Sequence, residues 1–134
     1  MISHQTALIY AMVIASAADG DMSDAELREI GELVHTLPVF KDYDSKRLTR
    51  DAADCASLLA KDEGLGKVLD IIADSLPQRL RETAYALACD VVAADLHADD
   101  EELRLLQMMR FRLEVDRLTA AAIERGTRAR HATL

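Results

Sequence analysis

Apolar residues recur along this chain with the spacing of helices, and no stretch alternates with the period of two that a strand requires. The segment from about 3 to 18 is apolar almost all round, which predicts a helix buried at the centre of the fold. In the following segment, Leu27, Ile30 and Val34 form one apolar stripe. The pattern predicts seven helices, over about 3–18, 23–37, 44–59, 63–76, 77–94, 99–113 and 116–125. We therefore expect an all-α protein folded as a compact helical bundle.

Residues that start or stop helices support these boundaries. Ser23 with Glu26, and Asp99 with Glu102, have the spacing of a capping box, in which the N-cap residue and the third helical residue each bind the other's backbone N–H. The other boundary signals are Pro38, Asp44, Pro77 and Asp116. Helix starts are therefore specified locally along most of the chain.

The two halves of the chain repeat one another at an offset of 76 residues. Residues 17–28 align with residues 93–104, and seven of the twelve positions are identical. The repeated unit, over about 7–39 and 83–115, consists of an apolar helix, an acidic turn and an amphipathic helix. We expect one domain, 1–134, built from two pseudo-symmetric helical hairpins that pack antiparallel about a pseudo-two-fold axis, with the apolar first and fifth helices at the centre.

The net charge of −8, from 24 acidic and 16 basic residues, argues against a nucleic-acid partner. Seven arginines and three acids give residues 103–134 a net charge of +4, which leaves −12 for the rest. The basic end, about 126–134, is expected to fray. No apolar segment is long enough to span a membrane, and the first residues do not resemble a signal peptide, so we expect a cytoplasmic protein that is not transmembrane.

Three residues with reactive or ionisable side chains fall inside apolar stretches. Cys55 and Cys89 lack the spacing of a metal or redox motif, so we expect two buried free thiols. Asp90 lies within the fifth predicted helix. For Asp90 we favour an edge of the helix that reaches solvent over a polar pocket in the core, since buried carboxylates are uncommon.

Short motifs in both halves carry a family resemblance. The first half has Ala-Ala-Asp-Gly at 17–20 and Ser-Asp-Ala-Glu-Leu at 23–27, and the second has Ala-Ala-Asp at 93–95 and Asp-Glu-Glu-Leu at 100–103. Over residues 7–125 the chain resembles the TerB family, which comprises tellurite-resistance-associated proteins and TerB-like domains of co-chaperones. The resemblance implies a helical bundle, a role in tellurite and stress resistance, and protein partners in a membrane-linked complex. It would place the protein in the cytoplasm or at the inner face of the membrane.

The resemblance also implies a divalent cation at the acidic turns. Its ligands would be Asp19 and Glu26 in the first half, and Asp95 and Glu102 in the second. Carboxylates together with turn carbonyls suit Ca²⁺ or Mg²⁺. The second turn has a leucine and a histidine where the first has Gly20, so the two turns are expected to differ in shape and in affinity.

Further candidate ligands are Asp21, Asp99 and His97, and an imidazole among carboxylates would suit Zn²⁺ or Ni²⁺. An isolated surface histidine in an acidic turn is more often only a solvated side chain whose charged form its neighbours favour. An EF-hand is excluded, because that loop requires glycine and glutamate where this chain has Asp24 and Ile30. Capping and the helix dipole account for the same acidic residues without an ion. The sequence leaves both interpretations open.

No catalytic motif is present: the chain lacks a nucleophile elbow, a phosphate-binding loop and a zinc-protease helix. We therefore expect a non-enzymatic TerB-like module with no certain cofactor beyond a candidate Ca²⁺, Mg²⁺ or Zn²⁺ ion. The alternative is a metal-independent protein-interaction domain, an adaptor or a co-chaperone-like module. A metalloenzyme acting on oxyanions is a third class, for which no base or nucleophile is visible. The sequence does not specify the oligomeric state.

Overall fold

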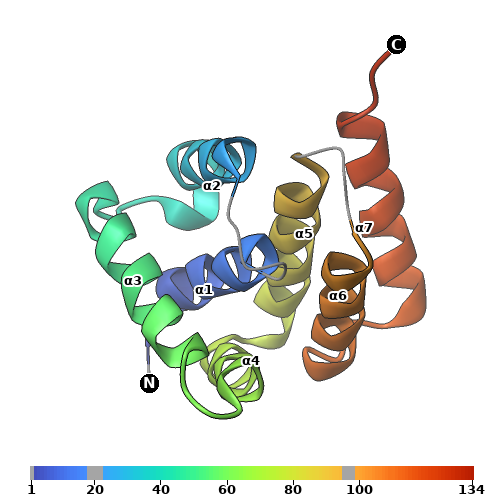
Figure 1. Cartoon of the computed structure of the whole chain (residues 1–134). Coiled ribbons are helices and arrows are strands. Elements are labelled where there is room, and N and C mark those ends of the chain that lie inside the picture. The colour runs from blue at the N-terminus through green and yellow to red at the C-terminus, as the bar shows by residue number, and fades with distance from the viewer. Residues whose placement is uncertain (1, 18–22, 95–98) are drawn as a thin grey trace.

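The computed structural model describes residues 2–17, 23–94 and 99–134, and within these ranges the chain forms seven α-helices, two 3-10 helices and no strand. The α-helices are α1 (His4–Ser16), α2 (Asp24–Thr36), α3 (Leu48–Leu59), α4 (Gly64–Ser75), α5 (Gln78–Ala94), α6 (Asp100–Arg112) and α7 (Arg117–Arg130), as Figure 1 shows. The 3-10 helices, η1 (Pro38–Phe40) and η2 (Ser45–Arg47), lie between α2 and α3. The predicted all-helical class is confirmed.

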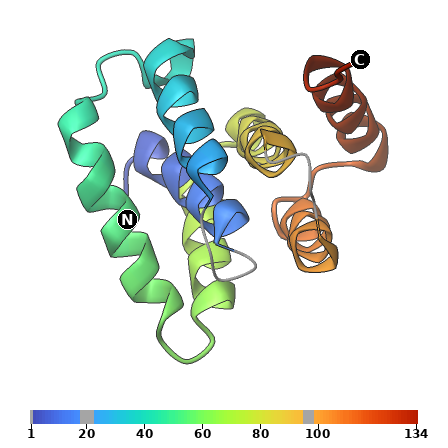
Figure 2. The same cartoon turned by 45° about the horizontal axis from the view of Figure 1, so that its top comes forward.

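Helix α1 lies at the centre of the fold because almost all of its side chains are apolar. Every residue from Thr6 to Ser16 is buried. Helices α3, α4 and α5 pack directly against it, and α2 covers one end (Figure 2). Even so, neither α1 nor any other described helix is long and apolar enough to cross a membrane.

Helix α5 is the second central helix, and it contacts α1, α2, α6 and α7. Figure 1 shows α5 crossing α1, and α3 and α4 also pack against α1. The repeat is visible in the helix boundaries, because α2 and α6 begin and end at positions 76 residues apart. A two-fold relation between whole hairpins stays a prediction.

The C-terminal segment is helical where the sequence led us to expect fraying. Helix α7 continues to Arg130, and the His131 N–H still bonds the Thr127 carbonyl. Thr127 is buried, and Arg130 donates a hydrogen bond to Asp90 of α5. Asp90 is itself buried, so the expectation that its edge of the helix reaches solvent is wrong. The buried acid and the basic end of the chain stabilise one another.

The turn between α3 and α4 depends on one glycine. Glu63 adopts a left-handed conformation with φ of 56°, and α4 begins at Gly64. A Cβ atom on Gly64 would lie 2.5 Å from the carbonyl oxygens of both Leu58 and Leu59. The close backbone approach therefore requires a residue without a side chain.

Candidate cation site at two helix N-termini

Helix α2 begins with a complete capping box. The Glu26 backbone N–H donates to the Ser23 Oγ at 3.1 Å, and the Ser23 backbone N–H donates to Glu26 Oε1 at 2.9 Å. This exchange folds the Glu26 side chain back over the first turn, where the free N–H groups of the helix point. The predicted box is confirmed.

Helix α6 begins in the same way, with an aspartate in place of the serine. The Glu102 N–H donates to Asp99 Oδ1 at 2.8 Å, and the Asp99 N–H donates to Glu102 Oε1 at 3.3 Å. Equivalent positions of the repeat therefore place one glutamate side chain at the start of each amphipathic helix.

Both glutamates are buried, at 2% exposure each. The positive end of the helix dipole stabilises a carboxylate at this position. Among the described residues, the second carboxylate oxygen of Glu26, Oε2, has no hydrogen-bond partner. A buried oxygen left in this state costs free energy. Glu26 Oε2 is therefore a position where a bound cation would be stabilising.

Four of the candidate ligands lie outside the described residues: Asp19, Asp21, Asp95 and His97. Asp99 is described; it is exposed, and one of its carboxylate oxygens caps α6. Within the described ranges, no group of three or more histidine, cysteine, aspartate or glutamate side chains is arranged to hold a metal ion. The coordination predicted for these four residues therefore stays a prediction.

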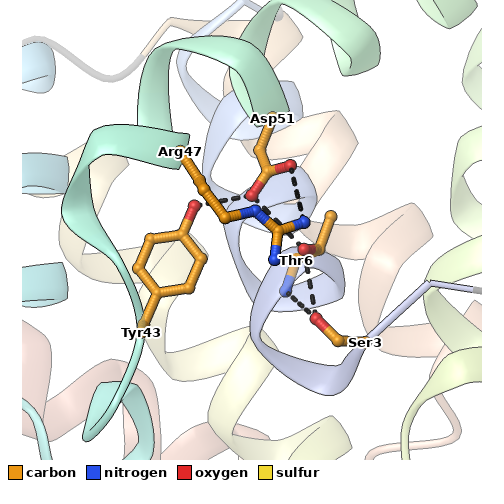
Figure 3. A network of polar contacts seen from close by, with 5 residues as sticks. All are labelled: Ser3, Thr6, Tyr43, Arg47 and Asp51. Atoms are coloured by element: carbon orange, nitrogen blue, oxygen red, sulfur yellow. Dashed lines mark hydrogen bonds and ion pairs between the residues drawn. The ribbon is translucent and has the colours of Figure 1, made fainter.

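Sequence reasoning missed another buried carboxylate, Asp51 of α3. Asp51 Oδ2 accepts a hydrogen bond from the Tyr43 hydroxyl at 2.5 Å and from the Thr6 hydroxyl at 3.3 Å, with Arg47 3.9 Å from Oδ1 (Figure 3). Burial, and next the hydrogen bond to Asp51, raise the pKa of Tyr43. The network joins the start of α1 to α3. Sequence spacing carried no signal for it, because Thr6 and Asp51 are 45 residues apart.

A third acidic cluster joins the end of the chain to α2 and α5. Arg130 Nη2 donates to Asp90 Oδ1 at 2.5 Å, and His131 Nε2 lies 3.5 Å from the same oxygen and 3.6 Å from Glu29 Oε2. Burial raises the pKa of Glu29, and the neighbouring His131 opposes this effect. Arg130, one of the basic residues at the end of the chain, is thus already paired within the fold.

The two thiols are not placed for nucleophilic chemistry. Cys55 and Cys89 are free and buried, as predicted. Burial raises the pKa of each thiol to about 12, so both stay protonated at neutral pH. A protonated, buried thiol is a poor nucleophile, and both cysteines act as small core residues.

These features define a class: a small all-helical domain on two central helices, with a buried glutamate at the start of each of two equivalent amphipathic helices. The TerB family, described as tellurite resistance protein TerB, matches residues 5–125. The chain therefore belongs to the TerB family. No curated protein and no solved structure matches it.

Proposed function

We propose that this TerB domain is a non-enzymatic module that binds a divalent cation at its acidic turns and acts in tellurite or stress resistance. The observation that supports cation binding is the buried Glu26 carboxylate, whose Oε2 has no hydrogen-bond partner among the described residues. The capping box leaves this oxygen free of any role in starting the helix, because Oε1 alone accepts the Ser23 N–H. A bound cation would supply the missing partner.

The residues next to each glutamate suggest which ions to test. In the first half, Asp19 and Asp21 precede Glu26 in sequence, and an oxygen-only ligand set favours Ca²⁺ or Mg²⁺. In the second half, His97 lies between Asp95 and Asp99 in sequence, and an added imidazole favours Zn²⁺. The two turns are therefore expected to differ in ion preference.

The test is calorimetric titration of metal-stripped protein with Ca²⁺, Mg²⁺ and Zn²⁺, comparing the natural chain with Glu26→Gln. Glutamine keeps an oxygen that can accept the Ser23 N–H, and it is the accepted alternative in a capping box. The substitution therefore removes the charge and preserves the helix start. We expect saturable binding by the natural chain, and an affinity at least about tenfold weaker in the variant, since a charged ligand is lost.

Asp24→Asn is the matched control, because Asp24 lies in the same turn but is exposed and takes no part in the capping box. It should bind the ion as the natural chain does. Chelation of the ion should lower the melting temperature of the natural chain and leave that of Glu26→Gln unchanged. The proposal would be overturned if the titration gave no saturable heat, or if Glu26→Gln bound the ion as tightly as the natural chain. Glu26 would then act only as a helix cap.

A second candidate function is protein interaction without a metal, in the manner of an adaptor or co-chaperone domain. The observation that favours it is a pair of exposed leucines, Leu27 and Leu103, which occupy equivalent positions in α2 and α6. Partner capture that persists with a chelator present, and that survives Glu26→Gln but not Leu27→Ser with Leu103→Ser, would favour this function. A partner in a membrane-linked complex would place the domain in the cytoplasm, at the inner face of the membrane.

A further inference from the structure

Helices α6 and α7 form the two walls of a hollow whose floor is α5. Both helices pack on α5, on its side away from α3 (Figures 1 and 2), but in the described part of the chain they make few close contacts with one another. The space between them is a hollow of about 470 Å³. Binding sites for small molecules have volumes of about 300–1,000 Å³. The hollow therefore has the size of a ligand site.

The wall formed by α6 is apolar at one end and polar at the other. Four residues spaced along one face of the helix line the hollow: Leu103, Leu106, Gln107 and Arg110. Leu103 is 52% exposed, although a leucine between two packed helices would be covered. Two helical turns, about 10 Å, separate Leu103 from Arg110. This wall suits a ligand that has an apolar part and a charged group.

Two arginines from different helices line the hollow, and within the described ranges neither is paired with an acid. The Arg110 guanidinium lies 4.4 Å from the centre of the Phe111 ring and donates a hydrogen bond to the Val115 carbonyl at 3.3 Å. Arg128 of α7 is exposed and has no hydrogen-bond or ion-pair partner among the described residues. Guanidinium groups bind carboxylates and phosphates through two parallel hydrogen bonds. Both arginines are therefore available to an anion.

The acidic residue in the lining, Glu124 of α7, already has a partner. Its Oε2 accepts a hydrogen bond from the hydroxyl of buried Tyr85 at 2.5 Å, which holds the carboxylate toward α5. The lining therefore carries two positive charges and one negative charge, whereas the whole chain has a net charge of −8. Because of this local excess of positive charge, the hollow attracts an anion although the chain as a whole repels one.

We propose that this hollow binds a small organic anion. The Arg110 and Arg128 guanidinium groups hold its carboxylate or phosphate group, and its apolar part covers Leu103 and Leu106. Binding of this anion requires no metal, so it does not depend on the cation proposed at Glu26. Its test is therefore made with a chelator present, and a failure there would leave the cation proposal as it stands.

The probes are hexanoate and hexyl phosphate, with acetate and inorganic phosphate as controls that lack the apolar part. Each is titrated into isotope-labelled protein while NMR follows the side-chain signals of Leu103, Leu106, Arg110 and Arg128. We expect saturable shifts of these signals with a hexyl probe, and binding about fivefold weaker or more with the matching control, since partial burial of the alkyl chain adds affinity. The comparison of the two hexyl probes identifies the preferred anionic group. No saturable shift with either hexyl probe would overturn the proposal.

Three variants test the role of the charges in hexanoate binding. Arg128→Gln should weaken binding by about fivefold, because one guanidinium group is lost. Glu124→Gln should strengthen it by about threefold, since it removes the opposing charge and keeps an oxygen for the Tyr85 hydroxyl. Arg125→Gln is the matched control, because Arg125 is exposed on the same helix but does not line the hollow. Equal weakening by Arg125→Gln and Arg128→Gln, or weaker binding by Glu124→Gln, would contradict an anion site in this hollow.

Discussion

Three of the buried acidic side chains in this TerB domain are stabilised by different contacts. Asp51 accepts hydrogen bonds from two hydroxyl groups, Asp90 pairs with an arginine, and Glu26 lies at the start of its own helix. The first two have all of these partners within the described structure, whereas Glu26 has one carboxylate oxygen without a partner among the described residues. This difference is why the cation proposal rests on Glu26 and not on the other two residues.

Gly64 offers a test of the tightest backbone approach in the fold. Gly64→Ala should lower the free energy of unfolding by about 1–3 kcal/mol, because its Cβ would lie 2.5 Å from the carbonyl oxygens of Leu58 and Leu59. Urea denaturation monitored by circular dichroism measures the change. Gly31→Ala is the control, because a Cβ there meets nothing within 4 Å in the middle of α2, and it should stabilise by about 0.5–1 kcal/mol. Equal effects of the two variants would refute the steric argument.

Alkaline pH tests the contact between Tyr43 and Asp51. Burial and the hydrogen bond to Asp51 raise the pKa of Tyr43 in the folded protein. A raised folded-state pKa stabilises the fold fully below the unfolded value of about 10, and that contribution declines as the pH rises above it. Tyr43→Phe should therefore make the melting temperature fall less steeply between about pH 9 and pH 12. An unchanged slope would mean that Tyr43 ionises equally in the folded and unfolded chains.

At the scale of helices, the sequence predicted where each helix starts better than it predicted which helices pack together. Ser23, Asp99 and Asp116 cap the helices that they were expected to cap, because capping depends on residues three positions apart. Asp44 instead caps η2, and α3 begins one turn later at Leu48. The cap formed by Asp44 depends only on neighbouring residues. The length of the 3-10 turn before α3 depends instead on how α3 packs.

Contacts between residues far apart in the sequence were harder to predict. The crossing of α5 over α1 depends on the helices that flank α1, and no local pattern encodes it. Asp90 was expected near solvent because its partner, Arg130, lies 40 residues away in a segment expected to fray. Of the candidate cation ligands, only Glu26, Glu102 and Asp99 fall within the described residues. The coordination predicted for the remaining turn residues stays a prediction.

On the scale of the whole molecule, Arg130 links the last helix to the core. Arg130→Ala should lower the free energy of unfolding by about 1–2 kcal/mol, because it removes the hydrogen-bonded partner of buried Asp90, although the arginine itself is half exposed. Arg128→Ala, two residues earlier and exposed, should change it by less than about 0.5 kcal/mol. Urea titrations compare the two. Amide hydrogen exchange at the end of α7 should accelerate only in Arg130→Ala, and identical exchange in both variants would contradict the link.

The burial of α1 has a consequence for how the chain is made. Its apolar surface is covered largely by α3, α4 and α5, and α5 begins only at Gln78. During synthesis, α1 leaves the ribosome well before this cover exists, since a chain is made from its N-terminus at about 5–20 residues per second. For several seconds the nascent chain therefore presents its most apolar helix without its native partners.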